Sequence, residues 1–266
     1  MGKIGLVAGK GVLPLEFIRS AREKGDKVVV FAIQKMASPE LDKTADRVYW
    51  LDVGQYKKFV FLLLKEMIRK LAFAGKIEKN LIYSKESYDE KGKGLLEGLK
   101  DKKDTSIFEE LTKRLRLMGV EVIEETRYLS HLLPKKGVIS NTVPDDRVKA
   151  DISFGYNTAK KLADMDIGQT VVVKDRSVVA VEAMEGTDAA ILRAKELAGD
   201  GCVMVKVSRP GQDMRWDVPV VGPKTMAMLI ENGFSAMAIE SGKMFLIEKE
   251  KILKMADEAK IAVEVL

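Results

Sequence analysis

Two valine-rich runs in the second half of this 266-residue chain each lead into a polar turn that contains glycine. One run and its turn cover residues 178–188, and the other run and turn cover residues 203–219. Short β-branched runs of this kind are typical of strands that are buried within a sheet. Carboxylates, amides and cations crowd the ends of both runs, and a solvated loop does not need so many groups of mixed type. The pattern therefore predicts strand ends that form a site for a phosphate and a divalent cation.

The first half of the chain alternates between strand-like and helix-like segments. Strand-like apolar runs lie at residues 3–8, 28–32, 48–50, 71–74 and 120–123. A helix begins near Pro14, and residues 107–118 have the period of an amphipathic helix. Residues 55–74 fit either one long helix or a helix to about residue 68 followed by a strand, and the alternation favours the second. This order predicts an α/β fold with an N-terminal Rossmann-like parallel-sheet domain over residues 1–130.

A mixed α/β C-terminal domain is predicted over residues 151–266. Residues 131–150 contain Pro134, Gly137 and Pro144 and show no periodicity, so we expect them to connect the two domains. Beyond them we expect helices at 152–164, 188–197, 223–232 and 248–260, strands at 170–174, 178–183, 203–207 and 236–239, and a hairpin-like segment at 243–247.

The composition excludes several classes of protein. The net charge of +5 is modest and no basic tract is interleaved with aromatics, so a nucleic-acid partner is not expected. Cys202 is the only cysteine, which excludes an intrachain disulfide and predicts a buried core residue in a cytoplasmic protein. The single histidine, His131, excludes a multi-histidine zinc site and is expected to be structural or on the surface. The longest apolar run, residues 59–64, is far shorter than the ~20 residues of a membrane-spanning helix.

A glycine-containing turn follows the first strand. Gly9 and Gly11 would let the backbone approach an anion, and the helix that follows offers free N–H groups to it. The turn lacks the third glycine of a dinucleotide-binding motif, and neither Asp46 nor Asp52 lies at the end of the second strand, where a ribose-binding acid belongs. An ordinary strand-to-helix turn is the alternative interpretation.

Acidic residues surround the glycine that follows the strand at 178–183. Glu182, Glu185 and Asp188 could supply oxygen ligands to Mg²⁺, which takes one or two carboxylates together with phosphate oxygens and water. Thr187 or Asp188 could instead cap the next helix. Capping leaves Glu182 and Glu185 without an explanation, so metal binding is the interpretation that covers all three acids.

The polar stretch after the second valine-rich run alternates in polarity. In an extended segment, Asp213, Arg215 and Asp217 would share one face. Arg215 would then hold phosphate groups together with Lys206 and Lys224, while the aspartates would hold a metal or orient water. An exposed half-strand with paired charges is the alternative.

At these motifs the chain resembles the LpxI family of UDP-2,3-diacylglucosamine pyrophosphatases, and the similarity covers nearly its whole length. The matching stretches are residues 166–173, 180–188, 205–213, 215–219 and 221–225 in the second half and 5–14 and 74–76 in the first. The chain has Lys10 where the family usually has glycine, residues 77–80 differ from the family pattern, and residues 83–104 align with it only loosely.

The resemblance implies a cytoplasmic enzyme of lipid A biosynthesis that uses Mg²⁺. It would cleave UDP-2,3-diacylglucosamine to 2,3-diacylglucosamine 1-phosphate (lipid X) and UMP, with at most peripheral contact with the inner membrane, and a homodimer is left open. The resemblance singles out Asp217 as the catalytic residue, and the residue pattern adds Lys206 and Arg215. Taking the residue pattern and the resemblance together, we expect Gly9, Gly11, Lys76, Thr187, Gln212, Asp213 and Lys224 to bind substrate and Glu182, Glu185, Asp188 and Asp217 to bind metal.

Two further hypotheses remain. One is a nucleotide-sugar or lipid binding protein without turnover. The other is a nucleotide-dependent oxidoreductase, which only the first strand–turn–helix supports.

Overall fold

A computed structural model describes residues 2–77, 89, 104–216 and 218–266 of the chain. Its contacts divide the chain into two compact units. The first comprises Met1–Ser130 with Met214–Asp217, and the second comprises His131–Asp213 with Val218–Leu266. The segment 83–104, which aligns only loosely with the family, lies outside the described residues apart from Asp89 and Asp104.

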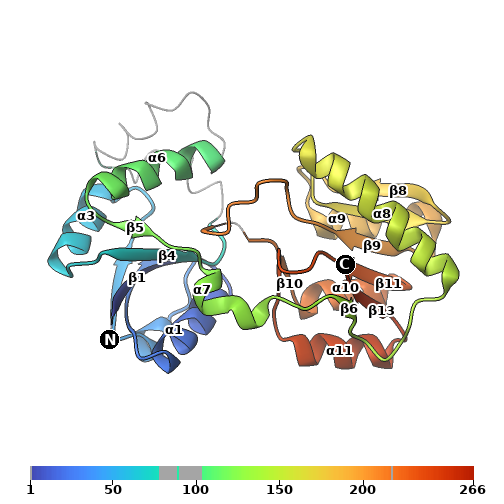
Figure 1. Cartoon of the computed structure of the whole chain (residues 1–266), viewed down its shortest axis with the longest axis horizontal. Coiled ribbons are helices and arrows are strands. Elements are labelled where there is room, and N and C mark those ends of the chain that lie inside the picture. Colours follow the sequence, from blue (N-terminus) through green and yellow to red (C-terminus); the bar gives the residue numbers. More distant parts are fainter. Residues whose placement is uncertain (1, 78–88, 90–103, 217) are drawn as a thin grey trace. The chain divides into compact units, whose positions relative to one another are not determined.

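The first unit is built on a parallel sheet of the order β3-β2-β1-β4-β5 (Figure 1). Its strands are β1 Lys3–Ala8, β2 Lys27–Ile33, β3 Arg47–Leu51, β4 Lys70–Ala74 and β5 Glu121–Val122. The order reverses between β1 and β4, as it does in doubly wound nucleotide-binding folds. The predicted Rossmann-like parallel sheet is therefore confirmed.

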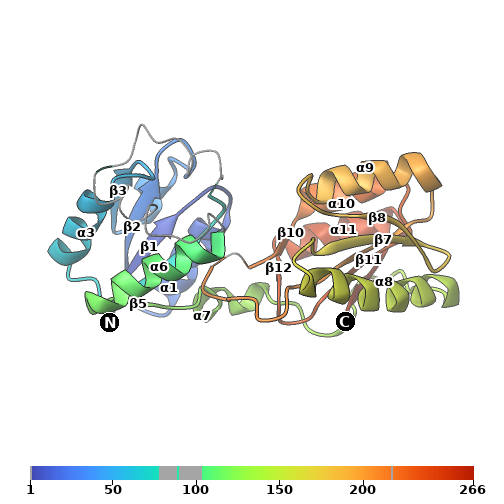
Figure 2. The same cartoon turned by 90° about the horizontal axis from the view of Figure 1, so that it is seen from above.

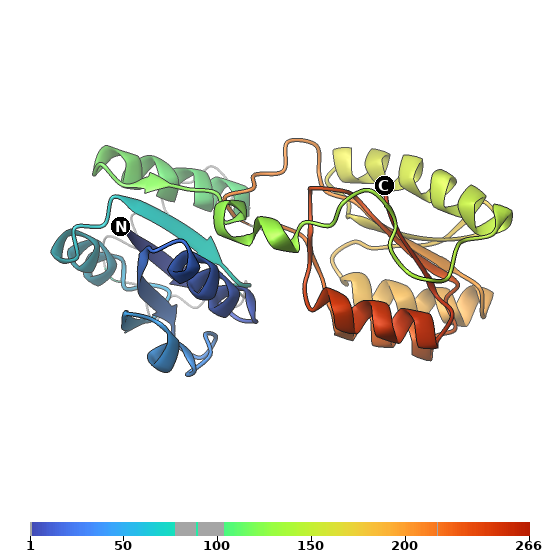
Figure 3. The same ribbon diagram turned by 60° about the horizontal axis from the view of Figure 1, so that its bottom comes forward.

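Helices cover both faces of this sheet. They are α1 Leu13–Glu23, α2 Leu41–Thr44, α3 Tyr56–Lys65, α6 Asp104–Leu117 and α7 Thr126–Leu129. Figure 3 shows α1 and α6 on opposite faces. On the α6 face, Leu62 and Leu63 of α3 and Leu115 of α6 pack with Phe31 and Leu71 of the strands. Because α3 ends before β4 begins, the prediction of a helix followed by a strand between residues 55 and 74 is confirmed.

The second unit contains a mixed sheet of the order β6-β13-β11-β9-β7-β8, which confirms the predicted mixed α/β class. β9, β11 and β13 run parallel, whereas β6, β7 and β8 are antiparallel to their neighbours. The strands are β6 Gly137–Val138, β7 Thr170–Lys174, β8 Ser177–Val181, β9 Val203–Lys206, β11 Ala236–Ile239 and β13 Ala262–Val265. A separate parallel pair joins β10 Val220–Val221 to β12 Phe245–Leu246.

Both faces of the second sheet are covered, which is why β9 is a continuous apolar run. Val203 and Val205 pack on the side of α8, and Met204 packs on the side of the other three helices. Figure 2 shows α8 and α9 on opposite sides of the strands. The helices are α8 Asp146–Asp164, α9 Thr187–Ala198, α10 Pro223–Glu231 and α11 Lys249–Glu258. Cys202 is fully buried in this core, which confirms its predicted structural role, and burial raises the pKa of its thiol.

The structure differs from the sequence prediction in two segments of the second unit. The stretch 131–150, expected to be a connection, contains a 3₁₀ turn, β6 and the start of α8. The helix begins early because Asp145 caps it, its carboxylate accepting a hydrogen bond from the Val148 N–H at 2.8 Å. The expected hairpin at 243–247 is instead β12, because its partner is the distant β10.

Within the described residues, no helix has both the length and the apolar composition to cross a bilayer.

A buried carboxylate ties the edge of the first sheet to the turn after α3. Glu66 is only 4% exposed, and its oxygens accept hydrogen bonds from Arg47 Nη1 at 2.6 Å, Tyr49 Oη at 2.7 Å and Lys3 Nζ at 3.2 Å. The hydrogen bond from Tyr49, with those from Arg47 and Lys3, lowers the pKa of Glu66 to about 2. The ionised form is therefore the one that stabilises this unit.

We predict that Glu66→Gln lowers the free energy of unfolding of the first unit by about 1–3 kcal/mol at neutral pH, the scale of hydrogen bonds to a charged group. The folded-state pKa is depressed, so the stabilisation is complete above the unfolded pKa of ~4.3 and is lost as the pH falls below it. Urea titrations at several pH values, followed by tryptophan fluorescence, measure the difference, because Trp50 and Trp216 both belong to this unit.

Exposed Glu109 on α6 supplies the control, and Glu109→Gln should change stability by no more than about 0.5 kcal/mol. A loss in Glu66→Gln that persists unchanged below the pH at which Glu66 titrates would contradict the prediction.

Candidate active site

One edge of the second sheet collects residues from motifs that are far apart in the sequence. Lys206 ends β9, and its register partners are Thr170, which starts β7, and Ile239, which ends β11. β8 ends at the same edge, so Glu182 follows it there. The stretches around residues 166–170, 180–188 and 205–213 therefore meet at this edge, as the sequence predicted for the strand ends.

Lys206 is held at the centre of this edge by two hydroxyls and a carboxylate. Its Nζ donates to Thr170 Oγ1 at 3.1 Å and to Thr187 Oγ1 at 2.8 Å, and lies 3.7 Å from Glu182 Oε2. Thr187 in turn donates to Glu182 Oε1 at 2.8 Å. Only 11% of the Lys206 side chain and 15% of the Glu182 side chain are exposed. The cluster thus fixes a cation and a carboxylate with little freedom to move.

Two opposing effects set the ionisation of Glu182. Burial alone would raise the pKa of this carboxyl, but the charge of Lys206 and the neighbouring threonine hydroxyls outweigh it and lower the pKa. Glu182 is therefore ionised at neutral pH. Within the described part of the chain its Oε2 is buried and lacks a hydrogen-bond partner.

A glycine makes this geometry possible. A Cβ added to Gly168 would lie 1.8 Å from the carbonyl oxygen of Glu182, so no other residue fits there without moving the chain. The close approach lets the Glu182 N–H donate to the Thr170 carbonyl at 2.9 Å. Gly168 belongs to the family-like stretch 166–173, and the sequence alone did not indicate why that stretch needs a glycine.

The three described acids assigned to metal binding each face a different cation. Glu182 pairs with Lys206, Glu185 lies 3.6 Å from Arg193 Nη1, and Asp188 accepts from Lys224 Nζ at 2.5 Å. Among the described residues, no group of three or more His, Cys, Asp or Glu side chains could hold a metal ion. The fourth predicted ligand, Asp217, lies outside the described residues, so metal binding stays a prediction.

A second polar network fixes the loop that follows β9. Glu240, directly after β11, accepts from the Ser208 N–H at 2.8 Å, from Ser208 Oγ at 2.9 Å and from Lys160 Nζ at 3.1 Å. This loop continues to Gln212 and Asp213, two predicted substrate-binding residues. The sequence analysis did not identify Glu240 or Lys160. A charged residue directly after the buried strand is the signal that could have pointed to Glu240, whereas Lys160 lies within α8 without a distinguishing pattern.

The glycine-containing turn of the first unit lies where its strand order reverses. The Gly9 N–H donates to the Ala74 carbonyl, and Lys10 and Lys76 exchange backbone hydrogen bonds of 2.9 and 3.0 Å. A Cβ on Gly9 would lie 2.6 Å from the Lys76 carbonyl oxygen, so close approach of two chain segments explains this glycine. Gly11 has a φ of 105° with open space around it. The structure therefore brings Gly9, Gly11 and Lys76 together at the carboxyl ends of β1 and β4.

The segment around Arg215 is not extended, in contrast to the prediction that Asp213, Arg215 and Asp217 share one face of a strand. Residues 214–216 form a turn and a bend and group with the first unit, whereas Asp213 groups with the second. The cause is an aromatic anchor, because the Trp216 ring stacks on Phe108 with a centroid distance of 4.5 Å and an interplanar angle of 22°.

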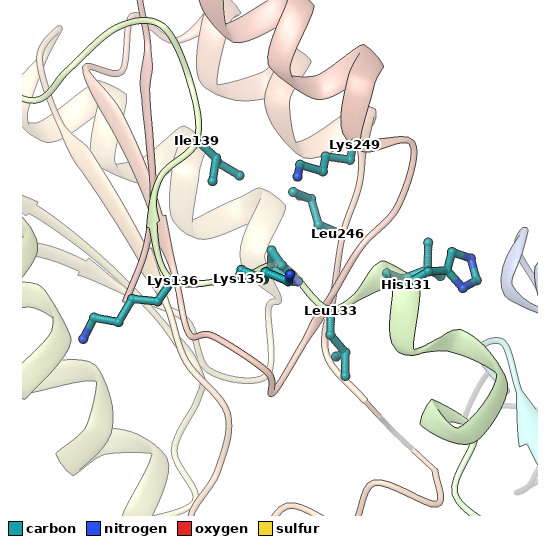
Figure 4. Close-up of a pocket in the computed structure, with 9 residues that line it drawn as sticks. His131, Leu133, Lys135, Lys136, Ile139, Leu246 and Lys249 are labelled. Carbon is teal, nitrogen blue, oxygen red and sulfur yellow. The ribbon is translucent and has the colours of Figure 1, made fainter.

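A separate cavity of about 390 Å³ opens in the second unit (Figure 4). The chain from His131 to Lys136 lines it together with Ile139, Leu246 and Lys249. None of the described residues that the sequence assigned to substrate or metal lines this cavity. His131 is exposed, as expected of a surface residue.

Comparison with known proteins finds a relative by sequence and several structures of low similarity. The protein named UDP-2,3-diacylglucosamine pyrophosphatase LpxI from Caulobacter vibrioides is 28% identical over 271 aligned residues, which cover 97% of this chain and 95% of that protein. The biotin carboxylase domain of Hydrogenobacter thermophilus 2-oxoglutarate carboxylase is 13% identical, with a TM-score of 0.30 over 65% of this chain and 35% of that chain.

The biotin carboxylase subunit of pyruvate carboxylase also has a TM-score of 0.30, at 12% identity over 75% of this chain and 43% of that chain. This chain thus spans less than half the length of either carboxylase, and TM-scores this low do not establish a shared fold. The family models give a different result. The LpxI N-terminal domain matches residues 3–132, and the LpxI C-terminal domain matches residues 135–264. The two models together cover almost the entire chain, which therefore belongs to the LpxI family.

Proposed function

We propose that this chain is a UDP-2,3-diacylglucosamine pyrophosphatase of lipid A biosynthesis, as its Caulobacter relative is named. It would use Mg²⁺ to hydrolyse the pyrophosphate bond and release 2,3-diacylglucosamine 1-phosphate and UMP. The observation that carries the proposal is the meeting of three family-like stretches around Lys206 at one sheet edge. A cytoplasmic location, peripheral contact with the inner membrane and a homodimer are proposals that rest on the family alone.

Hydrolysis of a diphosphate needs positive charge, because the anionic phosphates repel the attacking water. Lys206 offers a cation whose position two hydroxyls and Glu182 already fix, so little reorganisation is needed when charge develops. Lys224 and Arg215 are the other cations that we assign to the phosphates. Gln212 and Asp213 would contact the substrate from the loop that Glu240 and Ser208 anchor.

The described residues fit a bound Mg²⁺ in one respect. The Oε2 atom of Glu182 is buried without a hydrogen-bond partner among the described residues, and Mg²⁺ needs only one or two carboxylates beside phosphate oxygens and water. We assign Glu182, Glu185, Asp188 and Asp217 to the ion, as the sequence implies, and Glu182 is the described residue that this observation supports. When bound, Mg²⁺ would neutralise the diphosphate and polarise its P–O bonds.

The first unit has a position of its own that suits a phosphate-containing ligand. Ligands of open α/β sheets bind at the carboxyl ends of the strands where the order reverses, and Gly9, Gly11 and Lys76 lie there. We assign Gly9, Gly11 and Lys76 to substrate binding.

The two other hypotheses predict different behaviour. An NAD-type oxidoreductase needs an acid at the end of the second strand, but Gln34 and Lys35 follow β2. A binding protein without turnover would retain the ligand and release no product. Incubation with UDP-2,3-diacylglucosamine and Mg²⁺, with UMP followed by chromatography, separates all three hypotheses.

We predict that EDTA abolishes UMP release and that added Mg²⁺ restores it. The reason is that the described carboxylates are balanced by cations, and a diphosphate adds further negative charge that the ion must offset. UMP is measured before chelation, after chelation and after Mg²⁺ addition on one protein sample. Undiminished turnover after exhaustive chelation would exclude a metal mechanism.

Replacement of Lys206 or Arg215 by Ala should lower kcat/KM by the equivalent of roughly 2–5 kcal/mol, the scale of a lost buried charge contact. Lys206→Arg should recover less than full activity, because a guanidinium does not match the two hydroxyl partners that the ammonium has. Lys254→Ala, at an exposed lysine 3.9 Å from Glu258, is the matched control and should leave kcat/KM unchanged. Wild-type kcat/KM in folded Lys206→Ala and Arg215→Ala proteins would remove both residues from the mechanism.

Asp217→Ala should separate binding from chemistry. We expect kcat to fall by about 10²-fold or more, on the scale of losing a general base or an electrostatic stabiliser. Substrate binding should survive, since burial of acyl chains contributes ~0.8 kcal/mol per methylene independently of this carboxylate. Mass spectrometry of lipid retained by the purified variant, beside its turnover rate, tests both statements. A variant that loses bound substrate but turns over normally at saturation would make Asp217 a binding residue.

A further inference from the structure

Helix α3 turns an apolar face to solvent. Phe61 is 63% exposed, Leu64 is 60% exposed and Met67, just beyond the helix, is 74% exposed. Their neighbours Leu62 and Leu63 are buried in the core of the first unit, so the helix has apolar side chains on two faces rather than one. Large exposed apolar side chains gathered on one element mark an interaction surface more often than isolated ones do.

A further exposed apolar side chain lies at the end of α6, close to the turn that precedes β5. Leu117 at the end of α6 is 81% exposed. The turns before β4 and β5 adjoin, because the Glu121 N–H donates to the Arg69 carbonyl at 2.8 Å and a Cβ on Gly119 would lie 3.0 Å from Arg69 Nη1. In Figure 1, α3 and α6 lie on the same side of the first sheet. We call Phe61, Leu64, Met67 and Leu117 the α3 patch.

The segment that carries most of the α3 patch is rich in basic side chains. Residues 56–71 contain five basic side chains and one acid, Glu66. Glu66 is buried and bound to Arg47, Tyr49 and Lys3, so it presents no negative charge to solvent. The basic residues are Lys57, Lys58, Lys65, Arg69 and Lys70.

We propose that the α3 patch docks on the surface of an anionic phospholipid bilayer. Exposed apolar side chains would enter the boundary between head groups and acyl chains, while the lysines around them meet lipid phosphates. A second copy of this chain is a poorer occupant, since a two-fold contact would place these cations against the same cations of the other copy. Docking needs no hydrolysis, so it can hold or fail independently of the proposed reaction.

Flotation of the full chain with vesicles tests the proposal. Vesicles of phosphatidylcholine with and without phosphatidylglycerol are the probes, at low and high salt. Phe61→Ser/Leu64→Ser and Lys58→Glu/Lys65→Glu are the test variants, and Met165→Ser/Leu197→Ser removes apolar side chains of matched exposure, 66% and 68%, from the second unit. Light scattering gives the oligomeric state of each, and tryptophan fluorescence confirms that the first unit is folded.

We expect the wild type and the Met165/Leu197 variant to float with the anionic vesicles, with less binding at high salt. Each test variant should bind at least about tenfold more weakly, because each lysine near an anionic surface is worth ~1 kcal/mol and each buried methylene ~0.8 kcal/mol. Absence of wild-type binding, equal binding to pure phosphatidylcholine, or equal binding by the charge-reversed variant would overturn the proposal. Conversion of a dimer to a monomer by the Phe61/Leu64 variant, with unchanged vesicle binding, would assign the patch to a contact between copies.

Hydrolysis measured in detergent micelles keeps this test apart from the proposed reaction. The α3 variants should hydrolyse the micellar substrate at the wild-type rate, because the patch is not part of the sheet edge around Lys206. Vesicle binding by a wild type that releases no UMP would contradict the proposed hydrolysis and leave the docking surface standing.

Discussion

The hydroxyl of Thr187 accepts a hydrogen bond from Lys206 and donates one to Glu182, and the candidate site depends on this sharing. A largely buried ammonium and a largely buried carboxylate are each costly alone, and removal of one partner would leave the other uncompensated. The hydroxyl between them supplies the directional contacts that hold both groups in place. Gly168 contributes indirectly, by positioning Glu182. Only a residue without a side chain lets the Glu182 backbone approach the start of β7.

The same edge shows how a mixed sheet gathers a site from distant sequence. β7 runs antiparallel to β8 and β9, and β9 runs parallel to β11, so the start of β7 and the ends of β8, β9 and β11 lie together. Each strand end contributes a polar residue, and the Glu240 network fixes the loop that leaves β9. In the first unit, backbone contacts bring the strand ends together. Gly9 and Gly75 let the loops after β1 and β4 lie in direct contact.

The sequence predicted the fold class well because both sheets consist of buried apolar strands separated by clear turns. It placed Lys206, Thr187 and Glu182 near one another, since residues after buried strands converge at a sheet edge. It did not predict β12 or the turn at residues 214–216, where long-range pairing and ring stacking override local pattern. The sequence also did not predict which cations pair with the acids assigned to metal binding. Asp188 on α9 pairs with Lys224 on α10, and sequence spacing does not indicate such a pair between two helices.

The ring of Trp216 has a consequence for how the chain is made. It packs on Phe108 in the first unit, although it is encoded after most of the second unit. A ribosome releases the N-terminal sheet long before it adds this residue. The Phe108 ring of the nascent first unit therefore lacks its Trp216 partner until most of the second unit has been synthesised. A gene cut after residue 130 would encode a domain permanently left in that state.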